Sequence, residues 1–142
     1  MNYESTQQAL EALRKWQRTN AAYNHAMGVM YLDATTAAPN DSWEGRGQTF
    51  EVLSQVVYDL TADLNNGELL AYLEAHQAEL SAQEKREVEV LRKEYDQIHR
   101  IPAEEYVAYS VLLNDAQNVW EKAKNEDDFA SFAPLSPEDR GL

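Results

Sequence analysis

The chain has 142 residues, of which 44% are apolar, and its 25 acidic and 12 basic side chains give a formal net charge of −13 at pH 7. This size and composition suit a single domain with one core. The acidic balance argues against nucleic acid or an anionic membrane as a partner, because both need a basic surface. The absence of cysteine excludes disulfides and thiolate metal sites. No run of 18 apolar residues and no signal-peptide pattern occurs, so we expect a cytoplasmic protein without a membrane span.

The first predicted helix opens with a capping box formed by Ser5 and Gln8. It is expected to run to about Leu32. Thr19 and Asn20 are poor helix formers and mark the place where it could break. Its apolar positions recur at steps of three, four and seven: Leu10, Leu13, Trp16, Tyr23, Met27 and Met30.

Segment 33–42 is predicted to be a loop. Pro39 biases the residue before it away from helix, and Asn40-Asp41-Ser42 has the chemistry of a turn and a cap. A second helix is predicted from about Trp43 to Gly67, where Gly67 would take the left-handed conformation that ends many helices. Its apolar positions are Phe50, Leu53, Val57, Leu60 and Leu64.

Three more helices follow. A short one carries Leu69, Leu70 and Leu73. Ser81 and Glu84 form a second capping box, which opens a fourth helix that ends before Ile101. Its apolar positions are Val88, Leu91, Tyr95 and Ile98. The fifth helix begins with Pro102, a residue favoured in a first helical turn.

The fifth helix carries the longest apolar stripe of the sequence. The stripe consists of Tyr106, Tyr109, Leu113, Ala116, Trp120 and Ala123. We expect it to pack in the core along its whole length, so that Trp120→Ala would cost about 3–5 kcal/mol. Phe129 and Phe132 follow in a short turn that Asp127 and Asp128 can cap.

These patterns predict an all-α protein, an antiparallel helical bundle of about five helices, two of them long. No alternating run typical of a half-buried strand competes with this interpretation. Residues 1–135 are expected to form a single helical domain, and 136–142 a frayed polar tail.

The residues alone indicate no catalytic constellation. A zinc site of the HExxH type needs two histidines on consecutive turns with a glutamate between them, and His25, His76 and His99 do not fit it. A di-iron bundle needs paired Glu-x-x-His motifs, whereas the nearest match, Asp96 with His99, occurs once. The nucleophile motif GxSxG is also absent. We therefore interpret the histidines as surface or helix-end residues.

Three stretches follow a distinctive order. They are Met30 to Asp33 with Thr36, Pro39 and Arg46; then residues 88–102, VEVLRKEYDQIHRIP; then Val119-Trp120 with Asp128-Phe129 and Phe132 to Pro134. In order and spacing they resemble the thermostable carboxypeptidase family, zinc metallocarboxypeptidases typified by carboxypeptidase Taq. The resemblance covers about residues 5 to 135.

The resemblance implies the N-terminal helical part of such an enzyme, which walls one side of the substrate groove. The enzymes release C-terminal amino acids from peptides. Their zinc-binding HExxH, a downstream glutamate ligand and the arginines proposed to hold the substrate carboxylate lie beyond the matched region. This chain has no positions for those residues, so the resemblance implies no catalytic residue and no cofactor in the chain itself.

The family positions matched here are Asp33, Thr36, Pro39, Arg46, Trp120 and Phe129. We interpret them as structural. Asp33 and Thr36 are expected to cap or brace the loop, and Arg46 to pair with a carboxylate, in preference to contacting substrate.

Two functions remain open. The first is a non-catalytic groove-wall part of a metallocarboxypeptidase, whose partner is the missing catalytic part. The second is a free-standing acidic helical module that binds another protein through an apolar face. The chain could be an excised piece, a truncated gene product or an independent small protein. We also expect a homodimer, formed through the Phe129–Phe132–Leu135 end or the Met27–Met30–Tyr31 end, because uncovered apolar surface usually marks an interface.

Overall fold

A computed structural model describes residues 3–39 and 42–135, and this described part is helical and contains no strand. The helices are α1 (Thr6–Thr36), α2 (Trp43–Ala62), α3 (Leu64–Ala75), α4 (Ala82–Ile98), α5 (Ala103–Asn125) and the short α6 (Phe129–Phe132). Short 3-10 turns span Gln77–Glu79 and Ala133–Leu135. The predicted all-α fold is confirmed. None of the described helices is long and apolar enough to cross a membrane.

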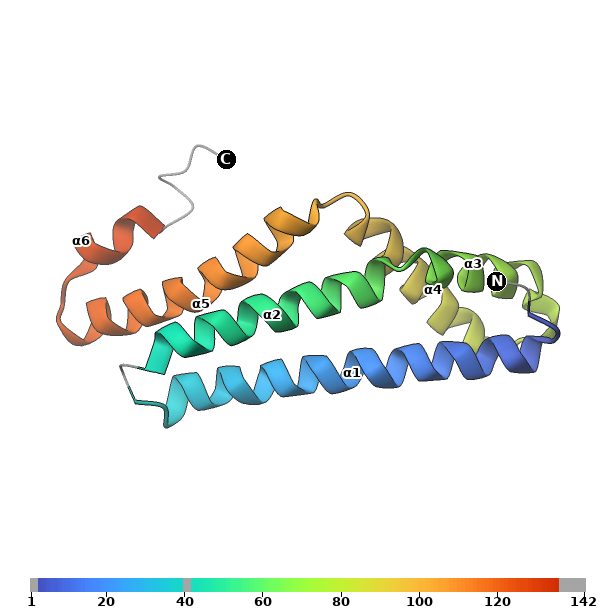
Figure 1. Ribbon diagram of the computed structural model, residues 1–142, viewed down its shortest axis with the longest axis horizontal. Coiled ribbons are helices and arrows are strands. Elements are labelled where there is room, and N and C mark those ends of the chain that lie inside the picture. The colour runs from blue at the N-terminus through green and yellow to red at the C-terminus, as the bar shows by residue number, and fades with distance from the viewer. Residues whose placement is uncertain (1–2, 40–41, 136–142) are drawn as a thin grey trace.

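The three longest helices give the molecule its elongated shape. α1, α2 and α5 run side by side along the long axis, while α3 and α4 lie at one end (Figure 1). α2 packs most extensively on α5 and next on α1, and α3 packs on α4 and α1. Each neighbouring pair among α1, α2 and α5 runs in opposite directions, as predicted for an antiparallel bundle (Figure 1).

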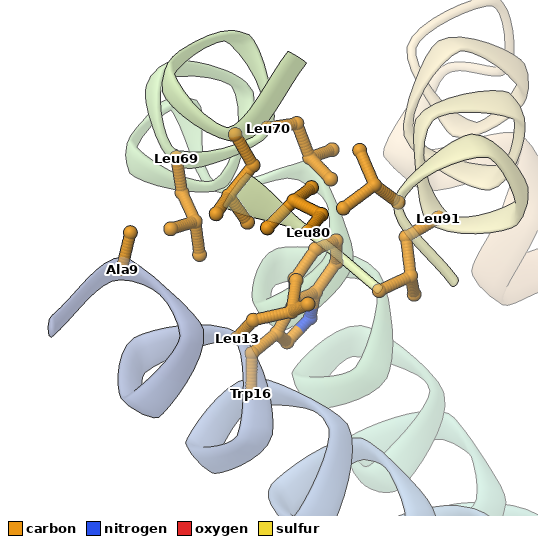
Figure 2. Packing of buried hydrophobic residues seen from close by; sticks show 9 residues of the cluster. Ala9, Leu13, Trp16, Leu69, Leu70, Leu80 and Leu91 are labelled. Carbon is orange, nitrogen blue, oxygen red and sulfur yellow. The ribbon is translucent and has the colours of Figure 1, made fainter. Parts of the chain in front are cut away.

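The buried core lies at the end formed by the first half of α1 together with α3 and α4. Figure 2 shows the side chains of this cluster converging from those helices. Its members are Ala9, Leu13, Trp16, Leu69, Leu70, Leu73, Leu80, Val88 and Leu91. The predicted capping box opens α4, because the Ser81 hydroxyl accepts from the Glu84 amide while the Glu84 side chain accepts from the Ser81 amide. The apolar positions predicted for the short third helix all belong to this core.

Helix α1 is a single helix, as predicted, but it is longer than predicted. It passes through Thr19 and Asn20 without a break, because the Thr19 hydroxyl donates to the Lys15 carbonyl and the Asn24 amide donates to the Asn20 carbonyl. These bonds stay within the helix, so two poor helix formers are tolerated. The helix ends at Thr36, which makes the loop shorter than predicted; Asn40 and Asp41 lie outside the described residues.

The prediction for Gly67 was wrong. α2 ends at Ala62, and Asp63 takes an extended backbone conformation and accepts from the Asn65 amide as the N-cap of α3. Gly67 lies inside α3, where the Tyr95 ring of α4 packs so closely that a Cβ would collide with it. Gly67 therefore permits a close contact between two helices.

The prediction that the α5 stripe is buried was also wrong. Tyr109 is 60% exposed, Leu113 53% and Trp120 42%, and among the residues of α5 only Ala123 is buried. The face of α5 turned toward α2 carries Tyr106, whose ring packs on Tyr58, and two asparagines, Asn114 and Asn118, that accept hydrogen bonds from Arg46. Pro102 precedes α5 as its N-cap. Tyr109, Leu113 and Trp120 of the apolar stripe are thus left largely exposed in the described part of the chain, whereas Tyr106 packs on Tyr58 of α2.

Candidate functional site

The six family positions lie at one end of the molecule, which we call the signature end. Asp33, Thr36 and Pro39 lie in and just after the last turn of α1, and Arg46 lies in the first turns of α2. Trp120 is near the end of α5, and Phe129 begins α6. These segments lie at the end of the molecule opposite the buried leucine core (Figure 1).

The end of α1 is closed by hydrogen bonds to backbone carbonyls. The Asp33 carbonyl accepts from the amides of Ala37 and Ala38, and the Thr36 hydroxyl donates to the Leu32 carbonyl. The side chain of Asp33 makes no hydrogen bond to a described residue. These bonds belong to the end of α1 itself, so the prediction that the Asp33 and Thr36 side chains brace the loop stays a prediction.

Arg46 holds α2 against α5, and it does so with neutral partners. Its Nε donates to Asn114 Oδ1 at 3.2 Å and its Nη2 to Asn118 Oδ1 at 2.8 Å, while Nη1 donates to the Ser42 hydroxyl at 3.2 Å. Beside it Gly47 is buried, and a Cβ there would lie 3.4 Å from Asn114 Nδ2. Among the described residues no carboxylate forms an ion pair with Arg46. Asp41 lies outside the described residues, so the predicted carboxylate partner stays a prediction.

An apolar hollow opens between α5 and α6. Trp120, Ala123, Phe129 and Phe132 line it together with Lys124 and Asp127, and it encloses about 330 Å³. The Lys124 ammonium lies 5.0 Å from the centre of the Trp120 ring, and the two phenylalanine rings are 6.3 Å apart. Phe129 is 70% exposed. The side chain of Leu135 lies outside what the structure describes.

The turn between α5 and α6 depends on backbone geometry. Asp127 adopts a left-handed φ of 54°, and the Asp128 amide donates to the Ala123 carbonyl at 2.8 Å. This arrangement ends α5 in the manner of a left-handed helix cap. Asp128 precedes α6 but makes no side-chain capping bond, so the predicted cap by these carboxylates is not found.

The residues present do not fit a zinc ion. Within the described residues, no group of three or more His, Asp or Glu side chains could hold a metal. His76 and His99 each end a helix, with Nδ1 at 2.8 Å from the carbonyl of Tyr72 and of Tyr95 respectively, and each ring packs on that tyrosine. His25 is exposed on α1. No catalytic step through a metal is therefore derived for this chain.

The shifted pKa values have structural causes. Burial raises the pKa of Tyr106, whose ring packs on Tyr58 at 5.5 Å. At the core end, the backbone hydrogen bond from Ser81 lowers the pKa of Glu84. Hydrogen bonding to Glu74 raises the pKa of Arg92. Clustered shifts in a cleft would suggest catalysis, whereas these belong to a buried ring, a helix cap and an ion pair.

Asn114 and Asn118 are the contact residues that the sequence interpretation missed. They continue the row Tyr106, Ser110 at steps of four, which places all four on one helical face. That row was a detectable signal, but the apolar stripe, which shares only Tyr106 with it, was preferred as the packing surface.

Comparison with known proteins matches this chain to one family, through a family model, a relative and a solved structure. The family model described as Carboxypeptidase Taq (M32) metallopeptidase matches residues 12–136. The chain belongs to the carboxypeptidase Taq family. It is 33% identical over 112 residues to Carboxypeptidase 1 of Bacillus subtilis (strain 168), and the structure superposes on the crystal structure of BsuCP with a TM-score of 0.82 at 30% identity.

The match covers only part of these carboxypeptidase Taq relatives. It includes 79% of this chain but 22% of Carboxypeptidase 1, and 85% of this chain but 24% of BsuCP. The chain thus spans about a quarter of the length of the relatives that it matches, and the predicted family is confirmed.

Proposed function

We propose that this chain is the N-terminal, non-catalytic groove-wall part of a carboxypeptidase Taq-like zinc metallocarboxypeptidase, working in the cytoplasm. The whole enzyme would release C-terminal amino acids from peptides. Two observations support a non-catalytic role for this chain within such an enzyme. The chain matches the family, and its histidines do not form a zinc site among the described residues. Zinc and the groups that activate water would come from the part of the enzyme that lies outside this chain.

The observation that carries the proposal is the amount of uncovered surface. Twelve large apolar side chains among the described residues are between 39% and 72% exposed. The exposed apolar side chains include Tyr31, Trp43, Leu113 and Phe129, all outside the leucine core. A helical layer with this much uncovered surface is typical of a part that packs against a larger body.

Two measurements test the proposal. Purified chain, supplied with zinc or cobalt and a blocked dipeptide with a free C-terminus, should show no turnover. Sequencing of the gene beyond codon 142 should reveal an HExxH motif in the same frame. Chelator-sensitive turnover by the chain alone would contradict the non-catalytic assignment, and a stop codon without that motif would contradict the groove-wall role.

The alternative is a free-standing interaction module. The hollow between α5 and α6 favours it, because four apolar side chains there could receive an apolar segment of a partner protein. In this case a second copy of the chain could cover the signature end and give a homodimer. Sedimentation at several concentrations and two salt levels tests the homodimer, which should strengthen as salt screens the −13 charge.

A further inference from the structure

The second half of α1 carries an exposed face with an unusual composition. No charged side chain occurs between Arg18 and Asp33. α2 packs along the side of α1 on which Tyr23, Met27 and Met30 are half-buried. The opposite side, which we call the outer face of α1, consists of exposed residues: Ala21, Ala22, His25, Gly28, Val29 and Leu32.

This composition does not suit a face that stays in water. A solvent-facing helix surface normally carries charged and polar residues, and a helix that is apolar on all sides is normally buried. Val29 is 52% exposed and Leu32 61%. None of the 25 acidic side chains of the protein lies on the outer face of α1. This face therefore lacks the negative charge that would repel an apolar or acidic partner.

Gly28 provides an independent observation. A Cβ placed at this residue would meet nothing within 4 Å, so no contact in the described part of the chain requires glycine there. A glycine inside a helix is less favourable than alanine. A glycine with open space above it lets the backbone of a second helix approach closely, as small residues do at other helix crossings.

We propose that a helix from the remaining part of the metallocarboxypeptidase crosses the outer face of α1 at Gly28. This inference rests on the proposed function and adds the surface and the kind of contact by which the two parts join. The occupant would present an apolar ridge, with side chains that pack between Val29 and Leu32. Charged groups of the occupant would lie beyond the ends of the face, near Arg18 and Asp33.

The uncovered area favours this occupant over a second copy. The large exposed apolar side chains of the described residues are distributed over all six helices. One contact with a second copy, which would bury about 800 Å² of this chain, would cover only some of them. The matched relatives are about four times longer than the matched segment, so they supply a body large enough to cover these side chains.

Thiol labelling tests the contact directly, because the chain contains no cysteine. Val29→Cys, which adds no bulk to the outer face of α1, would be made in the isolated chain and in a chimera in which this chain replaces the matched segment of Bacillus subtilis Carboxypeptidase 1. Labelling by a maleimide would be followed by mass spectrometry of the peptide that contains the position. Thr49→Cys is the matched control, since it is also an exposed β-branched residue in a helix and its neighbour Gln48 is polar.

The thiol at position 29 should react at least tenfold more slowly in the chimera than in the isolated chain, while the control reacts at similar rates in both. Equal rates at position 29, or equal protection at both positions, would overturn the inference. Protection in the isolated chain that grows with concentration would overturn it in favour of a second copy. The chelator-sensitive peptidase activity of the chimera without substitutions is a separate readout of the proposed function, so failure of either can be recognised.

Discussion

Gly67 of α3 and Tyr95 of α4 are in contact at a distance that admits no side chain on the glycine. A Cβ at Gly67 would lie 2.5 Å from the Tyr95 hydroxyl oxygen and 2.7 Å from the adjoining ring carbon. The ring has little freedom to move away, because it packs on His99 and lies under the Arg92 guanidinium, 5.6 Å from the ring centre. This contact fixes the distance between two of the helices that enclose the leucine core.

Gly67→Ala should therefore destabilise the protein by about 1–2 kcal/mol, the range for an overpacked site, although alanine favours helix. Urea denaturation would measure the change. The same substitution in a Tyr95→Ala background should be neutral or stabilising, because the collision is gone and only the helix preference remains. Equal destabilisation in both backgrounds would show that Tyr95 is not the cause.

Leu70→Ala and Trp120→Ala separate the core from the uncovered stripe. Leu70 is fully buried in the cluster shown in Figure 2, so its truncation should cost about 2–5 kcal/mol. Trp120 is 42% exposed, and its truncation should cost about 1 kcal/mol in the isolated chain. Midpoints of chemical unfolding measure both. A larger loss for Trp120→Ala than for Leu70→Ala would mean that α5 is packed differently.

The sequence predicts where the helices lie along the chain better than it predicts which helix faces pack against one another. Caps at Ser5 and Ser81 and the buried leucines of α3 were recognised because they depend on residues close in the chain. The burial of Trp120 was mispredicted because an amphipathic stripe shows that a partner exists without showing whether the same chain supplies it. In this fold Arg46 of α2 donates hydrogen bonds to Asn114 and Asn118 of α5, and Gly47 leaves room for Asn114. These contacts bring the asparagine side of α5, rather than Trp120, against α2.

For the six family positions, the sequence likewise predicts their place along the helices but not their contacts. Their gathering at one end follows from helix lengths that the sequence approximates, since α1 ends where α2 begins and α5 returns to that end (Figure 1). The partner of Arg46 could not be inferred from charge, because amides 68 and 72 residues away accept its hydrogen bonds. Long-range polar contacts of this kind have no periodic signal in the sequence of α2.

Arg46→Ala should loosen α5 from α2 and cost about 1–3 kcal/mol, the range for hydrogen bonds from a charged donor. Arg46→Lys should not restore stability, because one ammonium cannot reproduce the planar fork that reaches both asparagines. Unfolding by urea and amide hydrogen exchange in α5 would measure the effect. Arg86→Ala, which removes a largely exposed ion pair with Glu89, is the control and should change little.

Glu87 should contribute pH-dependent stability. Burial alone would raise the pKa of Glu87, but hydrogen bonds from Gln83, Arg14 and Gln17 outweigh it and leave the pKa below its usual value. A carboxyl group whose folded pKa is lowered stabilises the protein above its unfolded pKa, near 4.5. That contribution is lost as pH falls through the folded pKa.

Glu87→Gln should therefore be less stable than the wild type by about 1 kcal/mol at pH 6, and this difference should shrink as the pH falls below about 4. Glu51→Gln on the exposed side of α2 removes the same charge and corrects for the general effect of the −13 net charge. Thermal unfolding across this pH range provides the comparison. A difference that stays constant with pH would contradict the assigned role of the Arg14–Glu87 contact.

We propose that this chain forms part of a peptidase whose catalytic groups lie outside it. The most direct measurement is the release of the C-terminal amino acid from a blocked dipeptide by three proteins: the isolated chain, Carboxypeptidase 1 lacking its matched segment, and the chimera that joins them. We predict chelator-sensitive turnover by the chimera alone. A folded, zinc-loaded chimera without activity, or turnover by the isolated chain, would contradict the claim.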